Sequence, residues 1–329
     1  MILPPSIRKR ISKALNNKEG VSEFTKQKIL NICKELEYSP PRAENNLVNT
    51  KNIGFISSRN HSPVFHNPFY SLVISGIEIE VEKHDYNLLF STINLKTHNF
   101  EEVPQIIRQN KVDGLILAGA DIPLKLINKI EEINFPTVLV DNYVESDKID
   151  YIVSDNYNGA LSAVRHLIEM GHSSIGFVGG PLNHLSFLER FRAFKMEMME
   201  NRIPIDDNYV IIEEYKPGEM GIKAARKLLE NKLPTAILAA NDEIALNIMK
   251  TFQNAKINIP EDISLIGFDN IDITRYTSPS LTTVDINKEA MGQEAIRKLF
   301  DRIEDSDKLA TKSVIPTNLV KRKSVKDIN

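Results

Sequence analysis

From residue 52 onward, short apolar runs alternate with longer runs of helical periodicity, and this alternation constrains the fold more than any other feature. Strands are expected at 52–57, 86–92, 113–119 and 137–142, then at 151–155, 175–180, 209–214, 236–240 and 264–269. Helical runs separate them near 69–84, 101–110 and 122–132, then near 157–170, 185–201, 218–230 and 241–256. Alternation of this kind predicts parallel sheets with helices on both faces. Two such series predict an α/β body of two doubly wound lobes, with a ligand site where the carboxyl ends of the strands face each other.

The segment ahead of this body has the opposite charge. Residues 1–52 hold ten Lys or Arg and five Glu, a net charge of +5, whereas the rest of the chain carries −8 of an overall −3. A basic end on an acidic body indicates a nucleic-acid contact at that end. Chance surface charge is the alternative explanation.

Several classes of protein are disfavoured by what the sequence contains. Cys33 is the single cysteine, so an internal disulfide is impossible. Neither a signal peptide nor an apolar run of the roughly 20 residues that span a membrane is present, which predicts a cytoplasmic protein without a membrane partner. The loop "GGPLNH" lacks the Lys-Ser/Thr of a phosphate loop, and the seven histidines show no metal-ligand spacing. We therefore expect no enzyme, no catalytic residue, no metal and no cofactor.

The basic segment has the pattern of two short helices around a turn at Gly20. The first helix is expected to have an apolar face made of Ile7, Ile11, Ala14 and Leu15. Its solvent-facing side carries Lys9, Lys13 and Asn16. Ser22 can cap the second helix, whose expected buried stripe is Ile29, Ile32, Cys33 and Leu36. A short basic helix packed on a neighbour is typical of helix-turn-helix proteins that enter the major groove.

The order of residue types in this segment makes the pattern specific. "ISKALNNKEGVSEFTKQKILNICKELEYSP" resembles the second half of the DNA-binding headpiece of the LacI/GalR (lactose repressor) family. The resemblance implies DNA contacts by Arg8, Lys9, Ser12, Lys13 and Asn16. In the family linker that follows, a leucine wedges into the minor groove, and Leu47 matches it. Glu44 and Asn45 stand where the family usually has alanine and arginine, and a plain flexible linker is the alternative there.

The family headpiece begins with another helix behind the recognition helix, and this sequence has only "MILPP" in that place. We therefore expect a small, truncated all-α helix-turn-helix headpiece. A truncated or misassigned start, a decaying gene, and a protein that works without ordinary operator binding are three explanations that the sequence leaves open.

The resemblance extends over the body, from about residue 52 to 320. Consecutive family blocks match "DNYNGALSAVRHLIEMGHSSIGFVGG", "PTAILAANDEIAL", "IPEDISLIGFDN" and "SPSLTTVDI". They imply a periplasmic-binding-protein-like fold. The expected domains are a headpiece at 1–39, a linker at 40–51 and an effector-binding and dimerisation domain at 52–329. The body divides into an N-lobe, about 52–152 plus 284–312, and a C-lobe, about 153–283 plus 313–322.

A sugar site needs aromatic faces for the ring and carboxylates, amides and arginine for the hydroxyls. By their places after predicted strands and by the resemblance, the candidate effector-binding residues are Asn67, Phe69, Tyr70, Asp141, Arg190, Tyr215, Asp242 and Asp269. Structural roles compete with this assignment. Phe69 and Tyr70 could cap the core, Asp242 could serve only the helix dipole, and Arg190 and Asp269 could pair with each other.

These observations predict a cytoplasmic, homodimeric transcriptional regulator of repressor type. Its partners would be a double-stranded DNA operator and a small effector, a sugar or sugar derivative, bound between the lobes. A sugar-binding protein of the same fold without tight DNA binding is the alternative. A secreted solute-binding protein fits less well, because the basic segment would then have no role.

Overall fold

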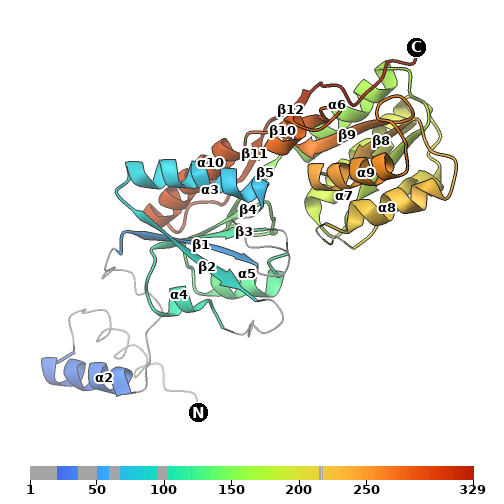
Figure 1. Cartoon of the computed structure of the whole chain (residues 1–329). Helices are drawn as coiled ribbons and strands as arrows, with labels where there is room; N and C mark the ends of the chain where they lie inside the picture. Colours follow the sequence, from blue (N-terminus) through green and yellow to red (C-terminus); the bar gives the residue numbers. More distant parts are fainter. Residues whose placement is uncertain are drawn as a thin grey trace.

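The structure is a computed structural model that describes residues 21–35, 50–58, 67–94, 102–119, 121–214, 216 and 218–329. It contains a helix, α2 (Glu23–Glu35), ahead of a body with two lobes (Figure 1). In the described part of the chain, no helix is long and apolar enough to cross a membrane.

The helix α2 begins where the sequence predicts. The Ser22 hydroxyl accepts a hydrogen bond from the backbone N–H of Thr25 at 3.3 Å, which confirms Ser22 as the N-cap. The expected buried stripe is wrong for Ile32, which is 44% exposed, and Phe24 on the same helix is 81% exposed.

The first lobe is built on a six-stranded parallel sheet in the order β11-β5-β4-β3-β1-β2. Its strands are β1 (Asn52–Ser58), β2 (Asn87–Ile93), β3 (Gly114–Ala118), β4 (Thr137–Val140), β5 (Asp150–Ser154) and β11 (Lys312–Ile315). Its helices are α3 (Pro68–Lys83), α4 (Gln105–Arg108), α5 (Leu124–Glu132) and α10 (Lys288–Glu304). The helix α4 is much shorter than the expected 101–110 because its helical backbone begins only after Pro104.

The second lobe repeats the plan with the strand order β12-β10-β9-β8-β6-β7. Its strands are β6 (Ile175–Gly179), β7 (Val210–Ile212), β8 (Ala236–Ala239), β9 (Ser264–Asp269), β10 (Thr282–Ile286) and β12 (Thr317–Val320), and only β12 runs antiparallel to its neighbour. The helices are α6 (Asn156–Glu169), α7 (Leu185–Glu200), α8 (Met220–Leu229) and α9 (Asp242–Asn254), with 3-10 turns η2 (Asp207–Tyr209) and η3 (Asp272–Arg275).

The chain crosses between the lobes three times, near Asp155, Asn287 and Pro316. The last two crossings lie three to four residues later than the expected boundaries, because β10 completes the second sheet and β11 the first. Figure 1 shows the lobes side by side with these crossings between them. The two doubly wound sheets agree with the fold that the alternating pattern predicts.

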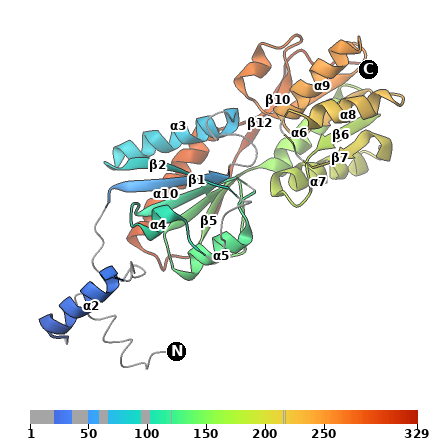
Figure 2. The ribbon, with the colours of Figure 1, turned by 60° about the horizontal axis from the view of Figure 1, so that its bottom comes forward.

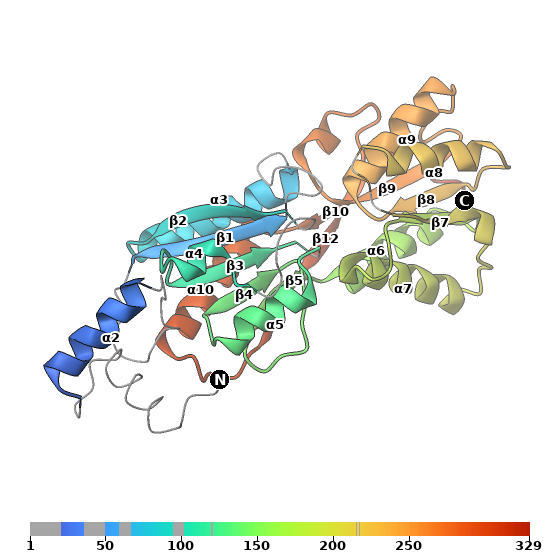
Figure 3. The same ribbon diagram turned by 90° about the horizontal axis from the view of Figure 1, so that it is seen from below.

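Each sheet is covered on both faces. In the first lobe, α3 and α10 lie on one face, whereas α4 and α5 pack with Ile56, Leu115 and Leu117 on the other (Figure 2). In the second lobe, α6 and α7 lie on one face and α8 and α9 on the other (Figure 3). Because both faces are buried, strands such as β3 are apolar at every position, as parallel strands usually are.

Two glycines allow α3 and α10 to pack backbone against backbone. A Cβ on Gly76 would lie 2.0 Å from the carbonyl oxygen of Glu289, and one on Gly292 would lie 2.1 Å from that of Val73. The buried Glu80 of α3 adds an ion pair to Arg297 of α10 at 3.2 Å. The N-terminal and C-terminal parts of the first lobe are joined at this contact.

Replacing Gly76 with alanine is expected to lower the free energy of unfolding by about 1–3 kcal/mol, because the clashing atom is backbone and the helices must separate. Urea unfolding monitored by circular dichroism measures the loss. Glu78→Ala, on the exposed side of α3, is the matched control and should stay within about 0.5 kcal/mol. Equal stability of both variants would show that this contact is loose.

Candidate functional site

Side chains of the two lobes meet at the carboxylate of Asp141. This residue follows β4, and its positive φ of 55° turns the chain at the end of the strand. One oxygen accepts a hydrogen bond from the Tyr70 hydroxyl of its own lobe at 2.8 Å. The other accepts from the Ser186 hydroxyl of the second lobe at 2.9 Å. Asp141 therefore links the lobes through the hydrogen bond from Ser186, while Tyr70 holds the same carboxylate within the first lobe.

Arg190 lies on the second-lobe side of this contact and is almost fully buried. Its Nε donates to Asn156 Oδ1 at 2.9 Å, one Nη donates to the carbonyl oxygen of Ala240, and the other to Asp269 Oδ1 at 3.4 Å. The guanidinium also stacks on the Phe268 ring, 3.7 Å from its centroid. A buried cation with this many partners is held in one orientation.

Asp269 ends β9 with φ of 105°, a conformation that residues other than glycine rarely adopt. The residues that follow are tied down firmly. The Asn270 amide donates to Asp285 at 2.7 Å and accepts from Arg322 at 2.7 Å, and the Ile271 N–H donates to Asp242 at 2.9 Å. These contacts over-determine the turn and so hold the Asp269 carboxylate beside Arg190.

We call the group formed by Tyr70, Asp141, Ser186, Arg190 and Asp269 the inter-lobe site. Its members lie on the first turns of α3 and α7, on the second turn of α7, and at the ends of β4 and β9. All of these places are at the carboxyl ends of parallel strands, where doubly wound folds bind ligands. Of the predicted residues, the structure brings together Tyr70, Asp141, Arg190 and Asp269.

Asp242 was expected to bind effector, and the structure places its carboxylate inside the second lobe. Its side chain is fully buried, with one oxygen accepting from Thr283 Oγ1 at 2.6 Å and the other from the Ile271 N–H at 2.9 Å. A Cβ on Gly267 would lie 2.1 Å from the same carboxylate, so the packing around it is tight. Asp242 supports the turn after Asp269 from behind.

Asn67 and Phe69 have structural contacts. The Asn67 side chain caps α3 by accepting from the Phe69 N–H at 2.9 Å. The Phe69 ring is 9% exposed, packs in the core and meets the Tyr70 ring edge-on at 5.1 Å. Phe69 thus positions Tyr70, while Tyr70 itself extends to Asp141. Tyr215 and the expected DNA contacts lie outside the described residues; these contacts are Arg8, Lys9, Ser12, Lys13, Asn16 and Leu47.

Two groups of the site have perturbed acidity. Burial raises the pKa of the Asp269 carboxyl from its usual 3.8 to about 6, with Arg190 and Lys288 opposing the shift and Asp141 adding to it. Burial, together with the charge of Asp141, raises the pKa of the Tyr70 hydroxyl well above its usual range. Tyr70 therefore stays a hydrogen-bond donor, and Asp269 is largely ionised at neutral pH.

Sequence reasoning did not select Ser186 or Asn156. Both lie at helix starts, where serine and asparagine are common for local reasons, so their type carries no signal. What could have indicated Ser186 is its spacing, because it lies four residues before Arg190 and therefore on the same face of α7.

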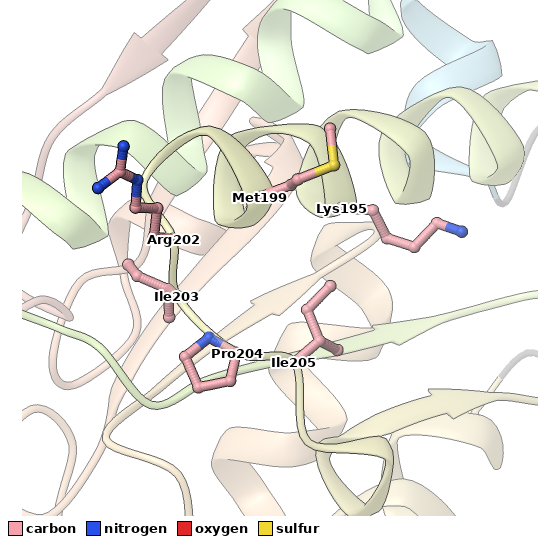
Figure 4. Close-up of a pocket in the computed structure, with 6 residues that line it drawn as sticks. All are labelled: Lys195, Met199, Arg202, Ile203, Pro204 and Ile205. Carbon is pink, nitrogen blue, oxygen red and sulfur yellow. The ribbon is translucent and has the colours of Figure 1, made fainter.

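Another hollow lies on the second lobe, at the end of α7 and the segment after it. Its lining residues are Lys195, Met199, Arg202, Ile203, Pro204 and Ile205. Figure 4 shows the charged ends of Lys195 and Arg202 directed outward, so the hollow presents mainly hydrocarbon. It lacks the carboxylates and amides that hydroxyl groups need. Among the described residues, no cluster of three or more His, Cys, Asp or Glu side chains could hold a metal ion.

Comparison with known proteins points in one direction. Residues 164–325 match the family described as periplasmic binding protein-like domain. The chain is 31% identical to the HTH-type transcriptional repressor PurR of Photobacterium profundum, over 97% of this chain and 95% of that protein. The structure resembles a transcriptional regulator CelR–cellobiose complex with a TM-score of 0.76, 25% identity and coverage of 96% and 95%. It also resembles a LacI family regulator from Enterococcus faecium with bound ribose, with a TM-score of 0.73, 27% identity and coverage of 84% and 100%.

Asp269→Asn is expected to make stability less dependent on pH. Because the folded pKa lies above the usual value, the folded chain binds more protons than the unfolded chain between about pH 4 and 6. This contribution to stability is therefore lost as pH rises through that window, by about 1 kcal/mol between pH 5 and 7.5. The asparagine variant lacks this loss, and urea unfolding at the two pH values measures it.

The exposed Asp272→Asn is the control for this experiment, since it removes the same charge three residues away. It should keep the parent's pH dependence. If the Asp269 variant also kept it, the carboxylate would have to be solvated in the folded protein.

Proposed function

This chain belongs to the LacI/GalR family of transcriptional regulators, and we propose that it is a repressor whose operator affinity is set by a small effector bound at the inter-lobe site. Its relatives named repressors support regulation of transcription, and no enzymatic activity is part of the proposal. We propose a homodimer acting in the cytoplasm, where operator DNA is found.

The effector we propose is a polyhydroxylated molecule, a sugar or sugar derivative. The observation that carries this proposal is the Arg190–Asp269 pair beside the Tyr70–Asp141–Ser186 link. The pair offers N–H donors and a carboxylate acceptor side by side, and a hydroxyl both donates and accepts. The cellobiose and ribose bound in the two similar structures agree with this chemistry.

The proposed mechanism follows from the position of the site. A ligand that contacts Asp141 from one lobe and Arg190 or Asp269 from the other favours the lobe arrangement in which both contacts form. It can shift the equilibrium only by its difference in affinity for the two arrangements. Coupling free energies between two such sites are commonly about 1–3 kcal/mol, which is a change of about 5 to 150-fold in operator affinity.

The DNA contacts remain proposals from the sequence. Arg8, Lys9, Ser12, Lys13 and Asn16 would lie in the major groove and Leu47 in the minor groove. One such helix reads a half-site, so two chains are needed for useful affinity. The basic charge of this segment predicts binding that weakens as the salt concentration rises.

Asp269→Ala is expected to weaken effector binding at least about tenfold, because it removes an acceptor and leaves the Arg190 cation buried without its carboxylate. A thermal-shift screen of sugars identifies a ligand, and isothermal titration calorimetry then compares the variants. Asp272→Ala, which removes an exposed carboxylate, should bind like the parent. The site assignment would be wrong if Asp269→Ala bound the ligand with unchanged affinity.

Operator binding should be dimeric and should respond to the same ligand. We expect fluorescence anisotropy at one fixed salt concentration to give two chains per operator and an affinity that changes about 5-fold or more when ligand is added. A stoichiometry of one chain, or ligand binding that leaves operator affinity unchanged, would contradict the proposal. DNA binding that does not depend on sequence would favour the alternative, a sugar-binding protein that has lost specific DNA binding.

A further inference from the structure

Among the described residues, the cations beside the inter-lobe site are Arg190 and Lys288, and both are buried and hydrogen-bonded within the protein. Arg190 is 5% exposed, and three of its five N–H groups donate hydrogen bonds to Asn156, Ala240 and Asp269. Lys288 is 3% exposed and donates to the carbonyl oxygen of Ile286 at 3.1 Å. The charge of Arg190 is paired with Asp269 and Lys288 is buried, so any further Arg190 N–H meets a ligand from beside a carboxylate.

Side-chain acceptors of the protein also lie at the helix N-termini beside the site. A helix N-terminus attracts anions. The α7 end has no side-chain cap, and the Asp141 carboxylate lies beside it, accepting from the Ser186 hydroxyl in the first turn. The α3 end is capped by Asn67, and the α9 end by Asn241, which accepts from the Ile244 N–H at 2.8 Å.

One carboxylate oxygen of Asp269 remains available to a ligand. Asp269 uses one oxygen for Arg190, and its other oxygen accepts no hydrogen bond from the described part of the chain. Its side chain is 15% exposed, more than that of Arg190 beside it. Asp269 thus offers a ligand an accessible carboxylate oxygen, which needs a donor such as O–H or N–H and repels another anion.

From these contacts we infer that the inter-lobe site selects uncharged polyhydroxylated effectors and rejects their phosphorylated or carboxylated counterparts. The inference rests on the proposed function and narrows its ligand class. A dianionic phosphate has no donor for Asp269, and it would have to displace Asp269 from Arg190 to reach that cation. That displacement leaves the buried Arg190 without its carboxylate partner, and the negative charge of Asp141 further repels the phosphate.

Asp141 is the residue on which this selectivity depends most. It lies at the start of α7, whose N-cap residue, His184, makes no side-chain cap hydrogen bond. Replacing it with asparagine removes the negative charge while the amide oxygen can still accept from Tyr70 or Ser186. We therefore expect Asp141→Asn to tolerate a phosphate that the parent rejects.

The test uses the full chain and matched pairs of ligands that differ only in one phosphate. Glucose, ribose and cellobiose are each compared with a phosphate ester of the same sugar by thermal shift and titration calorimetry at pH 7.5. In a pair whose neutral member binds, the ester should bind at least about tenfold more weakly, since like charges juxtaposed at a binding site are unfavourable. In Asp141→Asn this ratio should shrink by about fivefold or more.

Glu200→Gln is the control, because it removes one negative charge at the exposed end of α7, away from the site. It should leave the ratio unchanged. Esters that bind the parent as tightly as the neutral sugars would overturn the inference while leaving the proposed function intact. An unchanged ratio in Asp141→Asn would overturn the role of Asp141. Failure of both members of every pair would count against a sugar effector, and the inference would fall with it.

Discussion

The hydrogen bond between Asp141 and Ser186 is the contact on which the arrangement of the inter-lobe site depends. The three crossings of the chain tether the lobes, but tethering alone does not set their relative orientation. A carboxylate that accepts from Tyr70 on one side and Ser186 on the other adds a directional link. Because Asp141 and Arg190 are held on opposite lobes, any molecule that contacts both must respond to that orientation.

The support for Arg190 and Asp269 extends far behind the site. Asp242, Asp285 and Arg322 hold the two residues after Asp269, and Arg322 also donates to the Leu281 carbonyl at 2.7 Å. The turn at the end of β9 is therefore connected to the last part of the chain and to the start of η3. A shift of Asp269 would require these contacts to rearrange together, which is how a small movement at a ligand can be carried further.

Most of the body could be predicted from the sequence, because alternating strand and helix periodicity is a local signal. The C-terminal elements β10, α10, β11 and β12 were not assigned, since their places depend on crossings between lobes that periodicity does not reveal. The site was predicted in outline. Asp269 and Arg190 are brought together, whereas Asp242 turns inward although it also follows a strand.

The difference between these aspartates is physical. Asn241 caps α9, and the next side chain, Asp242, points back into the lobe. There its carboxylate accepts hydrogen bonds from the Thr283 hydroxyl and the Ile271 N–H. Asp269 instead has an unusual backbone angle that aims its carboxylate at Arg190. Neither the direction of a side chain after a cap nor a positive φ at an aspartate can be read from residue type, so spacing alone could not separate the two.

Hydrogen–deuterium exchange with and without a stabilising ligand tests the location of the site most directly. If the effector bridges the lobes, exchange should slow in the first turns of α3 and α7 and in residues 269–271, on both lobes at once. Protection limited to the hollow at 195–205, or to one lobe, would contradict the claim that the effector binds between the lobes and bridges them.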